Sequence, residues 1–263
     1  MSVRADPTYA LLRLLFRAGL RVVLGGALTV AGTARVPRAG GLLVCTNHIS
    51  TLDPALVPGC LPRDDSWSLG KAEYFTGRGW RPWLFRAYHG IPIARHSADR
   101  AALRRAAAVL RDGGALCIYP EGTRRGAAGM RRPEPGAGFL ALRTGVTVQP
   151  VAVAGTQDVL GPGARRPRRA PVRLVFGDPF TLAAEHRDGR RATAQDGSDA
   201  IMLSVAELLP PPLRGELADL DAWRSRVGDL RRYPVSGPRR SAGTRPGPRP
   251  GPPASPRTAA RGR

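Results

Sequence analysis

From Gly41 onward, short apolar runs alternate with segments that have helical periodicity. The runs read as strands, and they are GLLVC from Gly41, SWSLGKAEYF from Ser66, IPIAR from Ile91, ALCIYP from Ala115, VTVQPVAVAGT from Val146 and VRLVFGDPF from Val172. The helical segments lie at residues 97–114, 138–145 and 199–209. Because such alternation is typical of α/β domains, the sequence predicts one domain over residues 36–230, with a central, mainly parallel or mixed sheet flanked by helices.

The net charge of the chain says more about the binding partners of this domain than about its fold. The chain has 263 residues, of which 42% are hydrophobic, and this is enough to build a sizeable core. Its formal net charge is +21, and nearly all of the positive charge is arginine, because Lys71 is the only lysine. So basic a surface favours phospholipid headgroups, nucleic acids or acidic carrier proteins, and charge alone does not choose among them.

The cysteines and histidines argue against a disulfide framework and a metal centre. Cys45, Cys60 and Cys117 are an odd number without the spacing of a zinc site, which favours a reducing compartment. The four histidines are scattered, and no pair has the spacing of a helical metal site. We therefore expect no metal ligands in this protein.

Residues 1–35 contain a strongly apolar segment with arginines at four-residue steps, Arg13, Arg17 and Arg21. This spacing predicts an amphipathic helix with a basic stripe. The uninterrupted apolar window, 22–34, is too short for a bilayer span of roughly 20 residues, so the helix is expected to lie in the membrane interface. A signal peptide and an ordinary helix packed on the domain are the alternatives.

The composition changes beyond residue 230 to a sequence rich in Pro, Gly and Arg, without acidic residues. Such a segment buries too little apolar surface to offset the entropy that ordering costs. Residues 231–263 are therefore predicted to be a disordered basic tail, and residues 161–171 an exposed basic loop.

Polar side chains gather where three of the predicted strands end. NHISTLD follows the first strand, Arg95 follows IPIA, and EGTRR begins at Glu121. Ligands of open α/β sheets bind beyond the carboxyl ends of the strands, so these clusters are expected to share one crevice.

His48 and Asp53 can form a base and its orienting carboxylate, provided that His48 precedes a helix whose N-cap is Asp53, followed by Pro54. The alternative is a polar turn and helix cap without chemistry. In YPEGTRR, similarly, Gly122 can let the backbone approach a ligand while Arg124 and Arg125 bind a phosphate. That block can equally be a turn with solvated arginines.

NHISTLD at Asn47–Asp53 and YPEGTRR at Tyr119–Arg125 resemble the paired signature of the glycerolipid acyltransferases, most closely the lysophosphatidic acid acyltransferases. HGIPIARH, which contains Arg95, and VTVQPVAVAGT, which contains Pro150, are similar to two further blocks of that family. The blocks occur in the family's order over roughly residues 41–215. The α/β domain is thus expected to be an acyltransferase domain.

The resemblance implies roles for the matching residues. His48 would act as the general base that deprotonates the acceptor hydroxyl, with Asp53 orienting it, and the hydroxyl oxygen would attack the acyl thioester directly. The residues implied to bind the acceptor and its phosphate are Arg95, Glu121, Gly122, Thr123 and Arg124.

The implied reaction is acyl transfer from acyl-coenzyme A or acyl carrier protein to the free hydroxyl of lysophosphatidate, without a cofactor beyond the acyl donor. It would take place at the cytoplasmic face of the cell membrane, on an anionic surface and without a specific nucleic-acid partner. Glycerol 3-phosphate, another lysophospholipid or a lyso-aminolipid are alternative acceptors. A non-catalytic basic protein that binds membranes or nucleic acid is the alternative of a different class.

Overall fold

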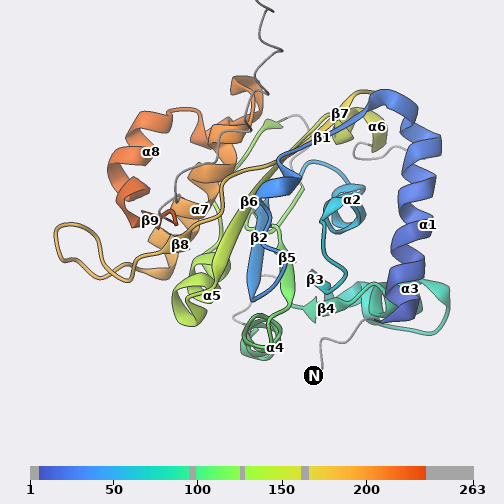
Figure 1. Cartoon of the computed structure of the whole chain (residues 1–263), viewed down its shortest axis with the longest axis horizontal. Helices are drawn as coiled ribbons and strands as arrows, with labels where there is room; N and C mark the ends of the chain where they lie inside the picture. The colour runs from blue at the N-terminus through green and yellow to red at the C-terminus, as the bar shows by residue number, and fades with distance from the viewer. Residues whose placement is uncertain (1–5, 95–98, 125–127, 161–165, 235–263) are drawn as a thin grey trace, which may run out of the picture.

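Within residues 6–94, 99–124, 128–160 and 166–234, which the computed structural model describes, seven strands form one sheet (Figure 1). Its order is β1-β7-β6-β2-β5-β3-β4, and every neighbouring pair is parallel except β6 and β7. The strands are β1 (Leu28–Ala31), β2 (Leu42–Thr46), β3 (Ser66–Lys71), β4 (Gly90–Ile93), β5 (Ala115–Ile118), β6 (Thr147–Ala154) and β7 (Val172–Phe176). The predicted α/β class with a mainly parallel, mixed sheet is confirmed.

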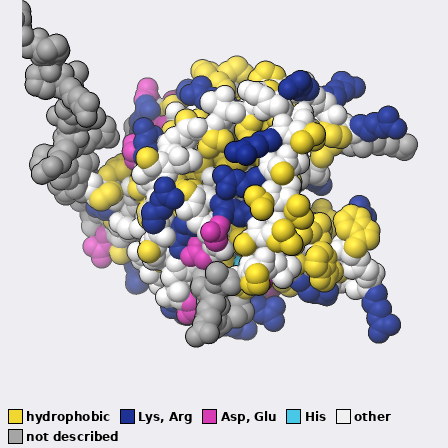
Figure 2. Space-filling model, turned by 45° about the vertical axis from the view of Figure 1, so that its right-hand side comes forward, with side chains coloured by type: hydrophobic (Ala, Val, Ile, Leu, Met, Phe, Trp, Pro, Cys, Tyr) yellow, Lys and Arg dark blue, Asp and Glu magenta, His cyan; other side chains and the backbone are white. Residues whose placement is uncertain are grey.

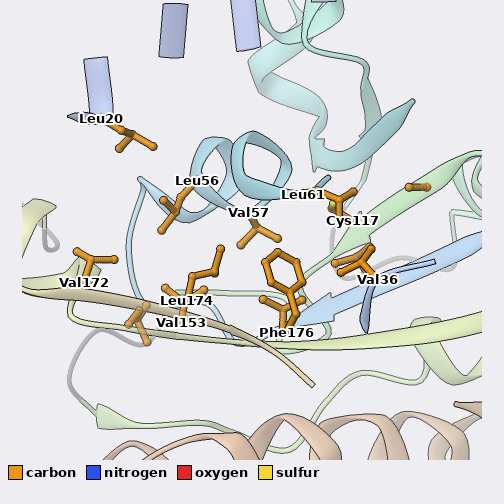
Figure 3. Packing of buried hydrophobic residues seen from close by; sticks show 14 of the residues in the cluster. Leu20, Val36, Leu56, Val57, Leu61, Cys117, Val153, Val172, Leu174 and Phe176 are labelled. Atoms are coloured by element: carbon orange, nitrogen blue, oxygen red, sulfur yellow. The ribbon is translucent and has the colours of Figure 1, made fainter. Parts of the chain in front are cut away.

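Helices cover both faces of this sheet, so that its central strands are buried on two sides. Leu20 of α1 and Leu56 of α2 belong to a cluster that includes Val153 and Phe176 on one face (Figure 3). On the other face, α4, α5 and α7 pack around residues such as Leu43. The helices are α1 (Pro7–Leu24), α2 (Asp53–Cys60), α3 (Trp80–Ala87), α4 (Arg100–Arg111), α5 (Gly136–Thr144), α6 (Thr156–Leu160), α7 (Ala194–Leu208) and α8 (Leu220–Val227). This two-sided burial explains why β2 reads as a continuous apolar run.

The N-terminal helix is packed on the domain through one of its faces. Asp6 caps α1 by accepting a hydrogen bond from the Thr8 backbone N–H at 2.8 Å, and Tyr9, Leu20 and Leu24 are buried. The packed helix was one of the alternatives from the sequence. The strand that follows, β1, pairs with β7 at the edge of the sheet, so residues 28–31 belong to the fold of the domain.

The predicted exposed basic stripe of α1 is wrong for Arg13. This side chain is buried, its Nε donates to the carbonyl of Pro58 at 3.2 Å, and its guanidinium also contacts Leu61 and Asp64. Pro58 and Leu61 lie at the C-terminal end of α2, where carbonyl groups can accept further hydrogen bonds; the Pro58 carbonyl also accepts from the Leu61 N–H at 3.3 Å. Arg13 is therefore buried because it supplies donors to those carbonyls, whereas Arg17 and Arg21 remain exposed.

The C-terminal part of the described chain adds a small layer outside α7. β8 (Thr181–Leu182) and β9 (Arg231–Arg232) form a two-stranded antiparallel ribbon, and α8 packs against α7. Arg231 and Arg232 are thus part of the fold, because they pair with β8, and do not begin a disordered tail as predicted. The rest of that predicted tail, residues 235–263, lies outside the described residues, as do residues 161–165 of the predicted loop. Among the described helices, none has both the length and the apolar composition needed to cross a bilayer.

Candidate active site

The loop after β2 is buried and is fixed to the neighbouring strand β6. The side chain of Asn47 donates to the carbonyl of Val153 and accepts from its backbone N–H, both at 2.8 Å. The backbone pairing of β2 with β6 ends at Thr46 and Val151. Beyond that point the Asn47 side chain takes the place of a strand backbone and continues the hydrogen bonding to β6. The following residue, His48, is therefore held at the C-terminal edge of the sheet.

His48 and Asp53 lie in direct contact, as the sequence predicted. His48 Nδ1 is 3.0 Å from Asp53 Oδ2, and both side chains are buried, with 5% of His48 and none of Asp53 exposed. Since an ionised carboxylate only accepts hydrogen bonds, Nδ1 carries the proton in this pair. The Nε2 atom of the neutral imidazole is then available to accept a proton.

Asp53 is not the N-cap of α2, contrary to the prediction. The helix begins at Asp53 itself, and Leu52 occupies the cap position without a side-chain hydrogen bond. The carboxylate instead folds back onto the preceding loop, where Oδ2 accepts from the backbone N–H groups of Ile49 at 2.8 Å and Ser50 at 2.7 Å. Asp53 Oδ2 binds these two N–H groups, and not the N–H groups of the first turn of α2, because the loop places them next to this oxygen together with the imidazole of His48.

Thr156 completes the carboxylate's set of donors. It is the first residue of α6, after β6, and its Oγ1 donates to Asp53 Oδ1 at 2.7 Å. The sequence reasoning did not single it out, although it ends the VTVQPVAVAGT block and follows directly on a strand. Four hydrogen bonds from two segments, the loop after β2 and the start of α6, thus fix the position and orientation of the Asp53 side chain.

Glu121, at the end of β5, supports the same loop from the other side. Its Oε1 accepts from the backbone N–H of His48 at 2.9 Å, and its Oε2 accepts from the backbone N–H of Arg131 at 3.1 Å. Glu121 is 1% exposed. The carboxylate therefore joins the loop that contains His48 to residues 128–135 and holds the backbone of the base in place.

Tyr119 packs on His48 and was not singled out for a role from the sequence. The ring centroids are 4.3 Å apart with an interplanar angle of 38°. Burial raises the pKa of the Tyr119 phenol well above its usual value, so the hydroxyl remains protonated at neutral pH. Among the described residues its Oη has no hydrogen-bond partner. The ring thus limits the movement of the imidazole through contact alone.

The other predicted site residues follow Glu121 in the same turn. Gly122 adopts a positive φ of 66°, which favours glycine, and Thr123 is half-buried. Arg124 is exposed, so its guanidinium is accessible to a ligand in solution or at a surface. Arg95 and Arg125 lie outside the described residues; β4, which precedes Arg95, ends at Ile93. Among the described residues, no group of three or more His, Cys, Asp and Glu side chains has an arrangement suited to a metal ion.

Comparison with known proteins shows which protein family has a similar sequence. Residues 27–154 match the family model described as Acyltransferase, and this range contains β1 to β6 with His48, Asp53 and Glu121. Residues 27–154 belong to the acyltransferase family. The family that NHISTLD and YPEGTRR indicated is confirmed.

The chain is also similar to individual proteins. It is 25% identical over 162 residues to the 1-acyl-sn-glycerol-3-phosphate acyltransferase of Borreliella burgdorferi, an alignment that covers 55% of each chain. It is 26% identical over 198 residues to a probable 1-acyl-sn-glycerol-3-phosphate acyltransferase of Mycoplasma pneumoniae, with 68% of this chain and 69% of that protein covered. The chain thus spans about half the length of the first relative and about two thirds of the second.

A solved structure shares the fold of this chain. The crystal structure of the 1-acyl-sn-glycerophosphate (LPA) acyltransferase from Thermotoga maritima superposes with a TM-score of 0.61 and 22% sequence identity. The superposition covers 76% of this chain and 79% of that one. At this identity the similarity establishes the architecture, and the chemistry has to be argued from the site.

Proposed function

We propose that this protein transfers a fatty acyl group from an acyl thioester, carried by coenzyme A or by acyl carrier protein, to the free hydroxyl of lysophosphatidate, giving phosphatidate. The observation that carries the proposal is the buried His48–Asp53 pair, with Nδ1 of the imidazole 3.0 Å from the carboxylate, inside a domain of the acyltransferase family. The names of the two relatives, both 1-acyl-sn-glycerol-3-phosphate acyltransferases, support this choice of acceptor.

The proposed chemistry uses His48 first as a base and then as an acid. Nε2 accepts the proton of the acceptor hydroxyl while the oxygen attacks the thioester carbonyl, and Asp53 stabilises the imidazolium that forms. When the carbon–sulfur bond breaks, the imidazolium returns its proton to the thiolate, so that a free thiol leaves. The acyl group passes directly from the thioester to the acceptor oxygen, and it is at no time attached to the protein.

The anionic acceptor needs a cationic partner, and the exposed Arg124 is suited to this role. Arg124 is exposed three residues after Glu121, whose carboxylate holds the backbone of His48. A guanidinium forms paired hydrogen bonds to a phosphate, which an ammonium group does less well. We assign the phosphate of the acceptor to Arg124 and Arg95, and the backbone around Gly122 and Thr123 to its glycerol.

The protein is expected to act while bound to the cytoplasmic surface of the membrane, where its acceptor resides. The face of α1 that points away from the domain exposes Leu11, Leu14, Leu15 and Val22, with 55% to 83% of each side chain accessible. Arg17 and Arg21, both exposed, lie on the same helix. Apolar side chains beside arginines are suited to the boundary between acyl chains and anionic headgroups.

The test is an acyl-transfer assay with the purified full chain in anionic vesicles, with lysophosphatidate and glycerol 3-phosphate as rival acceptors and each thioester as donor. We expect phosphatidate from the wild type, and a loss of about 10²- to 10⁴-fold in turnover for His48→Ala. Circular dichroism and thermal unfolding of the variant control for its fold. Near-native turnover of a folded His48→Ala protein would contradict the mechanism, and product from glycerol 3-phosphate alone would contradict the acceptor.

A further inference from the structure

A cavity of about 580 Å³ that opens widely to solvent lies between the loop after β8 and the segment from α8 to β9. Five arginines line it: Arg187, Arg190, Arg224, Arg226 and Arg231. Two carboxylates, those of Asp188 and Asp229, also line it, so cations predominate at its wall. α8 packs on α7, and α7 packs on β6, so the helix α7 separates this cavity from the active-site strands (Figure 1).

Carboxylates behind the wall hold the arginines in fixed positions. Arg226 Nη2 donates to Asp199 at 2.8 Å, and Asp199 is 1% exposed while about half of the arginine side chain is accessible. Arg224 and Arg231 both bind Glu207, at 2.9 and 2.6 Å. Because each guanidinium has five N–H donors, one edge can bind the buried carboxylate while another faces the cavity.

A buried histidine positions a fourth arginine. His186 Nδ1 lies 3.0 Å from Asp229 Oδ1, so the proton on Nδ1 is donated to the carboxylate. Its Nε2 then accepts from Arg190 Nη2 at 2.7 Å. Arg187 differs from the others, since among the described residues its side chain pairs with no carboxylate and only its backbone N–H is bound, to Asp229. The cavity thus combines ordered arginines with one whose guanidinium is available to a ligand.

We infer that this cavity binds a phosphate-bearing molecule at a site separate from the acyltransferase centre. Arrays of guanidinium groups match the geometry and charge of phosphate oxygens. The lining includes the imidazole of His186 but no aliphatic residue and no Phe, Tyr or Trp, so the ligand is a polar anion and not an acyl chain. The volume exceeds that of one phosphate and suits a small phosphorylated metabolite or a lipid headgroup.

The test is isothermal titration calorimetry of the full chain with inorganic pyrophosphate at low ionic strength, comparing the wild type with Arg187→Gln/Arg224→Gln. Both substitutions keep Arg226 and Arg231, which neutralise the buried carboxylates Asp199 and Glu207. We expect one saturable site in the wild type and a loss of affinity of about 10- to 100-fold in the variant. Arg104→Gln/Arg105→Gln, on the exposed face of α4, removes the same charge elsewhere and should change the affinity less than twofold.

A second arm identifies the source of the phosphate. The same proteins are sedimented with phosphatidylcholine vesicles that contain or lack phosphatidylglycerol. A selective loss of vesicle binding in Arg187→Gln/Arg224→Gln supports a headgroup ligand, and unchanged vesicle binding with weakened pyrophosphate binding supports a free phosphorylated molecule. The inference is wrong if the wild type shows no saturable pyrophosphate binding, or if the variant on α4 loses as much affinity as the variant in the cavity.

Discussion

At the scale of single residues, the orientation of His48 also depends on a side chain that does not touch it, Thr156. Asp53 holds the imidazole, and Thr156 holds Asp53 by donating to the second carboxylate oxygen at 2.7 Å. Thr156 follows β6, whereas His48 follows β2, so one hydroxyl connects the ends of two neighbouring strands. A buried carboxylate oxygen that loses its donor is costly, by about 1–3 kcal/mol.

We therefore expect Thr156→Val to lower kcat severalfold while leaving KM close to the wild-type value, because the base loses alignment and the acceptor loses no contact. The free energy of unfolding should fall by about 1–3 kcal/mol. Thr156→Ser is the matched control, since it keeps the hydroxyl, and it should restore both quantities. Steady-state kinetics and urea unfolding of the three proteins measure these effects; equal kcat in Thr156→Val and the wild type would exclude the positioning role.

Tyr119, unlike Thr156, contacts His48 directly, and it does so through its ring and not through its hydroxyl group. Its ring packs on His48 at 4.3 Å, and its buried hydroxyl has no hydrogen-bond partner among the described residues. Tyr119→Phe keeps the ring and removes the hydroxyl, so we expect activity within about twofold of the wild type and a free energy of unfolding equal or higher by about 1 kcal/mol. Tyr119→Ala should lose both activity and stability. A large loss of kcat in Tyr119→Phe would show that the hydroxyl acts in the reaction.

At the scale of secondary-structure elements, the sequence predicted those with a clear period or a clear cap. The apolar runs became strands β2 to β7, and the helical segment at residues 97–114 contains α4, whose N-cap Asp99 accepts from the Ala102 N–H at 2.9 Å. α3 and α8 were not predicted. Both are short and rich in arginine and tryptophan, and they depend on tertiary contacts, such as the packing of α8 on α7, that local periodicity does not carry.

The start of α7 allows a test of capping with a pH dependence. Thr193 is the N-cap, and Asp196 closes a capping box with it while binding Arg190 at 2.9 Å. Burial raises the pKa of Asp196, but the hydrogen bonds from Thr193 and Arg190 outweigh this and hold the pKa well below its usual range. The carboxylate therefore stabilises the fold fully above the unfolded pKa of about 3.9, and this stabilisation is lost as the pH falls below it.

We expect Asp196→Asn to lower the free energy of unfolding by about 1 kcal/mol at pH 7. The difference between the variant and the wild type should shrink progressively below about pH 4, because the Asp196 carboxylate of the unfolded wild-type chain then takes up a proton while that of the folded protein stays ionised. Chemical unfolding of both proteins between pH 3 and pH 7 provides the measurement. A difference that is constant over this range would mean that the charge of Asp196 is not the source of its effect.

At the scale of the whole molecule, short sequence motifs predicted where the site lies. They did not predict the contacts between distant segments that hold it together. The strand-end clusters predicted that His48 and Glu121 meet, and the parallel order β6-β2-β5 brings them together. The role of Glu121 on the backbone of His48 depends on a contact across 73 positions, and that of Arg13 on carbonyls 45 or more positions away. Such partners leave no local signal, which is why Arg13 was expected on an exposed stripe.

The helix α1 has an inner face that packs on the domain and an outer face that we expect to bind the membrane. Its inner face is tied to α2 through Arg13, so substitutions on the outer face should leave the fold intact. Figure 2 shows apolar side chains interspersed with arginines on this side of the molecule. Burying two leucines in a bilayer contributes about 3 kcal/mol, so Leu11→Glu/Leu15→Glu should weaken binding to anionic vesicles by about a hundredfold.

The matched control is Ala101→Glu/Ala222→Glu, which adds the same charge at exposed positions on α4 and α8. If α1 is the membrane-binding surface, the control should bind vesicles within a few fold of the wild type, and it should keep its acyl transfer. The Leu11→Glu/Leu15→Glu protein should lose acyl transfer on vesicles while keeping the wild-type unfolding temperature, since neither leucine belongs to the core. Equal vesicle binding by the two variants would assign membrane attachment to overall charge and leave α1 with a purely structural role.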